Sequence, residues 1–246
     1  MLWLRRLGVT LIVILMGPLI LAANGTGKIR SDWYSASRES AGIAPDPKKI
    51  TDPILQVYAA RAFSWRGAFA VHTWIAIKDQ NAEDYETHEV VGWGHHDDSG
   101  VLRSRTGVPD RYWYGAKPVL LTELRGQLAQ KAIREVREAI TTYPWPSSYQ
   151  SWPGPNSNTF TAWLIRQSPS VKANLPPTAI GKDYLGPLTF IGSAPSGTGI
   201  QLSLWGSFGF LVSEVEGLEI NILGLSFGLN PFSRTLRLAG LGTISF

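Results

Sequence analysis

Alternating apolar and polar positions predict a β-hairpin in the first half of the chain. Residues 69–78, FAVHTWIAIK, are rich in β-forming side chains whose central positions alternate between two faces. A polar turn follows, and then THEVVGWG, which also has the character of a strand. If the turn is centred near Ala82, His72 on the first strand lies opposite Gly92 on the second and comes close to His95.

Helical periodicity is found in three further segments. Apolar residues recur at helical spacing from Pro118 to about Ile140, which predicts an amphipathic helix that ends at Tyr143-Pro144. The segment FTAWLIRQ predicts a shorter helix that begins near Ser157, directly after a cluster of Pro, Gly and Asn residues. Upstream of the hairpin, QVYAARAFSW predicts a short helix that leads into the first strand.

The last quarter of the chain alternates with a period of two. Ile200, Leu202 and Leu204 are separated by Gln201 and Ser203, and the pattern continues through several turn-forming segments to the end. Glycine is too frequent here for a long helix. The segment therefore predicts an antiparallel β-meander.

Together these elements predict an α+β protein. Its core is an antiparallel sheet packed on helices, and a C-terminal antiparallel β extension packs on that core. The boundaries follow changes in composition: an apolar segment at 1–23, a polar tether at 24–52, the α+β core at 53–168, a Pro/Gly-rich loop at 169–199 and the β-meander at 200–246.

The N-terminus has the pattern of an export segment. Arg5-Arg6 precedes an uncharged run at residues 7–23, which is a short length for a bilayer span. Leu21 stands where signal peptidase requires a small residue, so an uncleaved transmembrane anchor is predicted over a cleaved signal peptide. In either case the main domain is expected outside the cytoplasm.

Charge and cysteine content exclude several functional classes. The formal net charge is +4, and without Arg5 and Arg6 the chain has 21 basic and 19 acidic residues. Such a balance provides no basic field for nucleic acid. The chain has no cysteine, which excludes disulfides, thiolate metal sites and thiol nucleophiles. We expect no cofactor and no metal site.

Two polar residues are candidates for acyl-transfer chemistry. His72 lies in an apolar strand, where an imidazole needs a polar partner. Ser157 lies at the predicted start of a helix, where backbone N–H groups and the helix dipole stabilise negative charge. His72 would act as a general base and Ser157 as a nucleophile. The alternatives are a hydrogen-bonded core histidine and a helix cap.

The hairpin also supplies candidates for a third member that orients His72. The expected register offers His95 or His96, and a slipped register offers Glu89. Polar and aromatic residues near these positions predict a cleft that binds a ligand, and they comprise Asn156, Asn158, Trp74, Trp93, Trp113 and Trp152.

Two other motifs do not fit the chemistry that they suggest. Residues 224–228, GLSFG, match a nucleophile elbow, but Pro231 prevents the required helix and no histidine follows His96. The HHDD segment at 95–98 contains metal-binding side chains, but a solvated turn explains it better than a metal site.

The order of these pieces resembles circularly permuted papain-like hydrolases and acyltransferases, the NlpC-related and lecithin–retinol-acyltransferase-like proteins. AVHTWIAI resembles their histidine strand, and PNSNTFTAWL resembles the start of their nucleophile helix. The resemblance implies a permuted papain-like core with His72 as general base. Ser157 stands where that group has cysteine, which departs from its usual nucleophile.

Most of the chain also resembles a family of bacterial envelope proteins, the domain of unknown function 3750. The resemblance rests on FSWRGAFAVHTWIA, EVVGWG, GVPDRYWYGAKP, WPGPNSNTF, IGKDY and EGLEINILGLSFG. It implies a bacterial envelope protein, but no established activity, substrate or site. Together with the N-terminal segment, it leads us to expect a location at the bacterial inner membrane, with the main domain facing the periplasm or cell exterior. We expect a membrane-anchored hydrolase or acyltransferase that acts on an envelope amide or ester. The alternative is a non-catalytic module that binds glycan, peptide or lipid in the same cleft.

Overall fold

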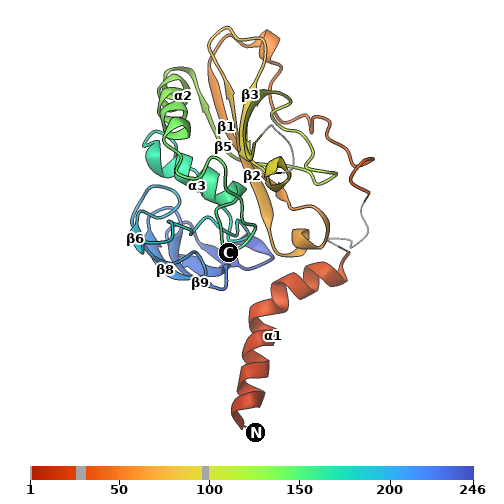
Figure 1. Cartoon of the computed structure of the whole chain (residues 1–246), viewed down its shortest axis with the longest axis vertical. Helices are drawn as coiled ribbons and strands as arrows, with labels where there is room; N and C mark the ends of the chain where they lie inside the picture. The colour runs from red at the N-terminus through yellow and green to blue at the C-terminus, as the bar shows by residue number, and fades with distance from the viewer. Residues whose placement is uncertain (1, 26–31, 96–99) are drawn as a thin grey trace.

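The computed structural model describes residues 2–25, 32–95 and 100–246; side chains at 94 and 95 and at many positions before residue 15 lie outside the description. Within these residues the fold contains three α-helices and two antiparallel sheets, so the predicted α+β class is confirmed. Figure 1 shows the two sheets on either side of a helical layer.

The first sheet has five antiparallel strands in the order β4-β3-β2-β1-β5. Their bounds are β1 Ile54–Arg61, β2 Val71–Lys78, β3 Glu86–Val90, β4 Leu102–Thr106 and β5 Val119–Arg125. The predicted hairpin is β2–β3, with Ile75 paired to His88. A turn centred on Ala82 would pair Ile75 with Glu89 instead. The one-residue difference moves Glu89 to the face of His72, because side chains alternate along a strand.

One predicted helix is wrong throughout, and a second is wrong at its start. Residues 54–61 form β1 rather than a helix, because both sides of this segment are paired, to β2 and β5. The amphipathic helix begins at Gly126 rather than near Pro118. The residues before Gly126 form β5 on the edge of the sheet, and the backbone of Gly126 adopts a φ of 61°, where glycine is favoured.

Helices α2 (Gly126–Thr141) and α3 (Ser157–Gln167) cover one face of this sheet. Their apolar side chains form the main core with Leu55, Val57, Ile75 and Ile77 from the strands. The opposite face carries a second, aromatic cluster that includes Tyr58, Trp74 and Trp113. The side chains of His72 and Trp74 project from this second face. Three short 3-10 helices border the sheet within the described residues: Pro47–Lys49, Ser64–Ala68 and Gly92–His95.

The second sheet is a seven-stranded meander in the order β12-β11-β10-β9-β8-β7-β6, so the predicted antiparallel extension is confirmed. The strands are β6 Ile191–Gly192, β7 Ile200–Leu204, β8 Phe208–Ser213, β9 Gly217–Ile222, β10 Leu225–Asn230, β11 Thr235–Leu238 and β12 Gly242–Ser245. The GLSFG segment lies across the β9–β10 turn and β10, which has no helix after the serine.

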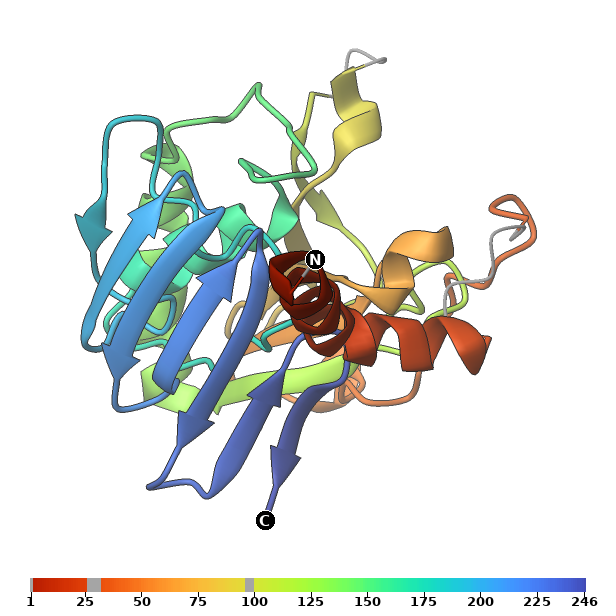
Figure 2. The ribbon, with the colours of Figure 1, turned by 90° about the horizontal axis from the view of Figure 1, so that it is seen from below.

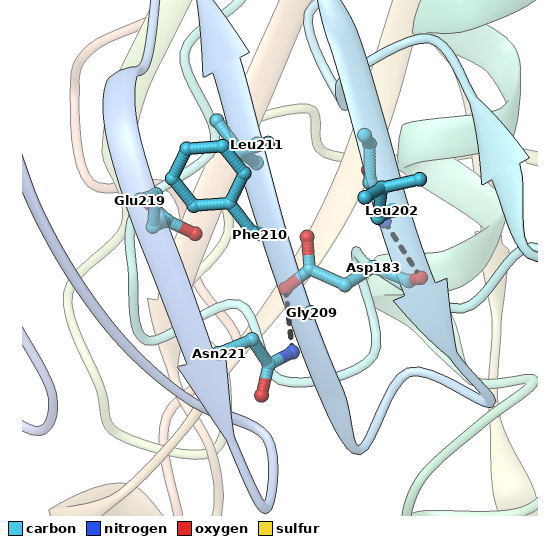
Figure 3. Close-up of a pocket in the computed structure, with 8 residues that line it drawn as sticks. Asp183, Leu202, Gly209, Phe210, Leu211, Glu219 and Asn221 are labelled. Carbon is cyan, nitrogen blue, oxygen red and sulfur yellow. Dashed lines mark hydrogen bonds between the residues drawn. The ribbon is translucent and has the colours of Figure 1, made fainter.

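A buried ionic network joins the second sheet to the rest of the fold. Lys182 binds Asp183 and Glu219, and Arg237 of β11 binds Glu219 at 2.6 Å and the carbonyl of Leu175 at 2.7 Å. Figure 3 shows Asp183 beside Asn221, whose amide donates to it at 2.9 Å. The inner face of the sheet is therefore polar and paired with polar groups of the preceding loop.

Helix α1 (Leu2–Ala23) leaves the body beside the second sheet (Figures 1 and 2). It is fixed in its C-terminal third, because a side chain at Gly17 would meet the carbonyl of Ala239, and a side chain at Gly240 would meet the backbone of Pro18. Among the residues that the structure describes, no helix has both the length and the apolar character needed to cross a bilayer. The predicted transmembrane anchor gains no support from these residues.

Candidate functional site

His72 is held in a fixed orientation on the aromatic face of the first sheet. Its Nε2 atom lies 2.8 Å from Oε2 of Glu89, which projects from the neighbouring strand β3. The imidazole stacks on the indole of Trp113, with ring centroids 3.5 Å apart and an interplanar angle of 7°. Both His72 and Glu89 are buried, so neither the ring nor the carboxylate is free to rotate away.

Arg111 completes a buried chain of three polar residues. It donates to Oε1 of Glu89 at 2.6 Å, and its guanidinium lies over the rings of Trp74 and Trp113. Burial acts to raise the pKa of Glu89, but the hydrogen bond from His72 and the charge of Arg111 outweigh it and lower this pKa to about 2. Glu89 is therefore a carboxylate at neutral pH, and its charge is compensated by Arg111.

The ionised carboxylate determines where the imidazole carries its proton. Burial lowers the pKa of His72 below 6.5, so the ring is neutral at pH 7. A carboxylate only accepts hydrogen bonds, so the nitrogen that faces Glu89, Nε2, carries the hydrogen. The lone pair is then on Nδ1, which has no hydrogen-bond partner among the described residues. His72 is thus prepared to accept a proton at Nδ1.

Ser157 is the first residue of α3, and it is not the cap. Asn156 caps the helix, because its side-chain oxygen accepts from the backbone N–H groups of Asn158 and Thr159 at 2.9 and 3.1 Å. The Asn156 amide also donates to the carbonyls of Ser151 and Ile180, each at 3.0 Å. The capping alternative for Ser157 therefore does not hold, and its hydroxyl is not required to end the helix.

Asn158 attaches the start of α3 to both neighbours of His72. Its amide donates to the carbonyl of Val71 at 3.0 Å, and its side-chain oxygen accepts from the hydroxyl of Thr73, also at 3.0 Å. Thr73 lies 3.4 Å from the carbonyl of Ser157 as well. These contacts fix Ser157 on the helix side of β2, whereas the ring of His72 projects from the aromatic side of the same strand, and no hydrogen bond joins the two side chains in the described part of the chain.

The backbone N–H of Ser157 is a second polar group that is available at this helix end. The N–H groups of the next two residues bond to Asn156, and that of Phe160 donates to the carbonyl of Asn156. The Ser157 N–H has no such partner among the described residues. At the positive end of the helix dipole, an unpaired N–H stabilises a developing oxyanion.

The predicted aromatic residues are divided between two regions. Trp74 and Trp113 both stack on His72, and Trp93 stacks on Trp113 at 5.7 Å, so these three belong to one aromatic group. Trp152 lies apart from them, because its indole donates to the carbonyl of Leu223 at the β9–β10 turn. The side chain of His95 lies outside the described residues, as does all of His96.

A cavity of about 250 Å³ lies beside the aromatic group. Its walls include three arginines and four aromatic residues, namely Arg38, Arg105, Arg111, Trp93, Tyr112, Trp113 and Tyr114. Arg105 also lies 3.4 Å from Glu89, so the cavity and the buried chain share charged groups. A cavity lined by several guanidinium groups attracts an anionic ligand.

Sequence reasoning did not identify these arginines. Arg111 lies within GVPDRYWYGAKP, the segment that connects β4 to β5. The mixture of Arg, Tyr and Trp in that segment was the available signal, because aromatic and guanidinium groups combine in buried recognition sites. No period or motif, however, relates this segment to Glu89, since the contact spans 22 residues of loop and edge strand.

Comparison with known proteins identifies one family. The model of a family described as "Protein of unknown function (DUF3750)" matches residues 52–184, which include β1, His72, Glu89, Arg111 and Ser157. No curated protein and no solved structure matches the chain. The match covers more than half of the chain, and it leaves the second sheet and α1 outside its bounds.

Proposed function

The chain belongs to the DUF3750 family of proteins of unknown function, and we propose that it is an acyl-transfer enzyme, a hydrolase or acyltransferase that uses Ser157 as nucleophile. The observation that carries this proposal is the placement of Asn158. It ties the start of α3 to Val71 and Thr73, the residues on either side of His72, whose ring projects from the opposite face of the sheet near the start of β2 and whose Nδ1 is free to accept a proton.

The proposed reaction has two steps. In the first, the hydroxyl proton of Ser157 passes around the first residues of β2 to Nδ1 of His72 through a bridging water while Oγ attacks the acyl carbon, and the N–H of Ser157 donates to the oxyanion. The protonated His72 then gives its proton to the departing amine or alcohol. In the second step, water or another alcohol or amine attacks the acyl-serine and His72 takes its proton; the acyl–Oγ bond then breaks, and His72 returns the proton to Oγ of Ser157. Glu89 holds the ring and stabilises the transient imidazolium.

The cavity beside the site supports an anionic substrate. Arg38, Arg105 and Arg111 line it, and none of the described residues in its walls is acidic. A carboxylate or phosphate near the scissile amide or ester would pair with these groups. Together with the apolar N-terminal run, this favours an acidic glycan, peptide or lipid of the bacterial envelope. The proposed location is the inner membrane, with the main domain facing the periplasm or exterior.

A fluorophosphonate probe, which reacts with activated serines, tests the proposal on the full chain. We expect wild-type protein and Ser226→Ala to be labelled, and Ser157→Ala to remain unlabelled. Ser226 is a matched control, because it is buried and belongs to the GLSFG segment. Unlabelled wild-type protein, or labelling that persists in Ser157→Ala, would contradict the assignment of Ser157 as nucleophile.

A second function is favoured by the cavity itself. Its arginines and tryptophans would bind an anionic ligand whether or not Ser157 reacts, which makes the chain a non-catalytic binding module. Calorimetry with acidic disaccharides and acidic dipeptides distinguishes the two. Binding that is lost in Arg105→Met but unchanged in Ser157→Ala, in a protein that no probe labels, would establish the binding module in place of the enzyme.

A further inference from the structure

The outer face of the second sheet is apolar and exposed. Along β7, β8 and β9 each residue that points away from the body is apolar, and all of these side chains except Ile222 are about half exposed. The exposed apolar residues of this face are Ile191, Ile200, Leu202, Leu204, Phe208, Phe210, Val212, Leu218, Ile220, Leu229, Leu236 and Ile244. We call this set the outer apolar face.

Strand pairing places these residues in continuous rows. One row runs across six strands in register, from Ile200 through Val212, Leu218, Leu229 and Leu236 to Ile244. A second row contains Ile191, Leu202, Phe210, Ile220 and Phe227. With strands about 4.8 Å apart and about 3.4 Å per residue, these rows cover on the order of 500 Å². Water-facing surfaces rarely keep an apolar patch of this extent without a binding role.

The inner face of the same sheet is polar, in contrast to the outer apolar face. The residues between the apolar ones include Gln201, Glu219, Asn221 and Arg237, and all four are buried and hydrogen bonded. An antiparallel sheet with one solvated face normally buries its apolar side and exposes its polar side. This sheet does the opposite, so its outer face is built for an apolar environment. Figure 3 shows Leu202 and Phe210 on the strands that carry the polar network.

Helix α1 indicates which apolar environment that is. It is attached at Gly17 to the β11–β12 turn, so it leaves the body at the edge of the second sheet. Figure 2 is seen from the end toward which α1 extends; there the sheet lies in front of α2 and α3, beside the helix. Ile12, Met16, Leu19 and Ile20 of α1 are themselves exposed. A flat face with an apolar helix projecting beside it fits a lipid layer, whereas a protein partner would need a channel for the helix.

We propose that the outer apolar face docks on a phospholipid bilayer, with α1 entering the same layer. The rim of the face suits this position. Trp205 lies in the β7–β8 turn, half exposed, and its indole N–H donates to the carbonyl of Pro187. Tryptophan is favoured where apolar and polar regions of a membrane meet. Phe232 and Phe246, at the β10–β11 turn and the last residue, are also strongly exposed.

The absence of cysteine permits a direct test on the full chain, because a single introduced cysteine takes an environment-sensitive label at one position. Leu202→Cys places the label on the outer apolar face, and Leu128→Cys places it on α2. The two leucines are matched, with exposures of 50% and 51%. Each labelled protein is mixed with vesicles of phosphatidylethanolamine and phosphatidylglycerol, and quenching by a water-soluble and by a lipid-bound quencher is compared.

We expect vesicles to protect the label at 202 several-fold from the aqueous quencher and to expose it to the lipid-bound one, while the label at 128 does not change. A label at 202 that remains accessible to water on bound protein would show attachment through α1 alone and overturn the proposal. Protection at 202 without vesicles, together with a doubled mass in solution, would show that a second copy covers the face. As an independent check, Leu202→Glu/Phe210→Glu should weaken vesicle binding and leave fluorophosphonate labelling unchanged.

Discussion

The Nε2 atom of His72 lies 2.8 Å from Oε2 of Glu89, and this contact fixes both the ring and its protonation. The other carboxylate oxygen accepts from Arg111, so Glu89 connects a buried imidazole to a buried guanidinium. The same carboxylate therefore orients the proposed base and compensates a buried positive charge. Replacing Glu89 should therefore lower the reaction rate, because His72 is no longer oriented, and lower the stability, because Arg111 loses its partner.

Glu89→Gln should lower the free energy of unfolding by about 3 kcal/mol, because Arg111 is left as a buried charge without its partner. Urea denaturation monitored by tryptophan fluorescence measures this. Glu86→Gln is the matched control, since Glu86 is also on β3 but is partly exposed and pairs with Arg137 at the surface. We expect that control to cost less than about 1 kcal/mol. Equal losses in the two variants would contradict a buried charge pair at Glu89.

Acid should destabilise the fold in a defined pH range. The pKa of Glu89 is about 2 in the folded chain against an ordinary value of 4.5, so the unfolded chain takes up this proton first as pH falls. The contribution of Glu89 is complete above pH 4.5 and is lost between pH 4.5 and 2, amounting to about 3 kcal/mol. Urea midpoints across this range should fall less steeply in Glu89→Gln than in wild type. Parallel slopes would argue against the depressed pKa.

The proposed reaction should depend on pH through His72. Burial lowers the pKa of His72 below 6.5, and only the neutral ring accepts the serine proton. The rate of fluorophosphonate labelling should therefore rise with pH and reach half its plateau below pH 6.5. In Glu89→Gln the plateau itself should drop by about 10²-fold or more, because the amide no longer fixes the tautomer. A midpoint well above 6.5 would show that another group acts as base.

The sequence was sufficient for the hairpin, the two covering helices and the meander, because each has a clear period. It failed for β1 and β5, whose apolar and charged residues fit a helix as well as a strand. Long-range pairing decided those segments, since β1 lies between β2 and β5 and satisfies its backbone on both sides. Periodicity within a segment carries no information about such partners.

At the candidate site, single residues were easier to predict than their relationships. His72 and Ser157 stand out from the pattern, and the histidine needed a partner. Which residue is that partner depends on the centre of the β2–β3 turn. A centre on Ala82 puts Glu89 on the other face of the sheet, whereas a centre half a residue earlier puts Glu89 on the face of His72. The roles of Arg111 and Asn158 depend on contacts across the fold, so no local signal could supply them.

In the buried ionic network under the second sheet, removing one charge of an ion pair should lower the free energy of unfolding more than removing both charges. Arg237→Met leaves Glu219 with only Lys182 as its cationic partner, and we expect a loss of about 3–5 kcal/mol in unfolding free energy. The double variant Arg237→Met/Glu219→Gln removes both charges and should recover part of that loss. A double-mutant cycle in urea measures the coupling. Additive losses would show that the two side chains do not stabilise each other.

Gly181→Ala should separate positioning of Ser157 from general stability. A Cβ at Gly181 would lie 2.3–2.7 Å from the side-chain amide of Asn156, the cap of α3. Moving that amide would displace the start of the helix, and a displacement of this order costs about 10²-fold in rate. Gly115→Ala is the control, because its φ of 86° resembles the 98° of Gly181 while its Cβ would meet nothing within 4 Å.

Both alanine variants should lose stability through backbone strain, by about 1–2 kcal/mol. Only Gly181→Ala should slow fluorophosphonate labelling, measured well below its unfolding midpoint where both proteins are folded. Since Asn156 also accepts from the first turn of α3, Gly181→Ala should show faster amide hydrogen exchange at Asn158 and Thr159. Equal labelling rates in the two variants would mean that the Asn156 cap does not position the serine.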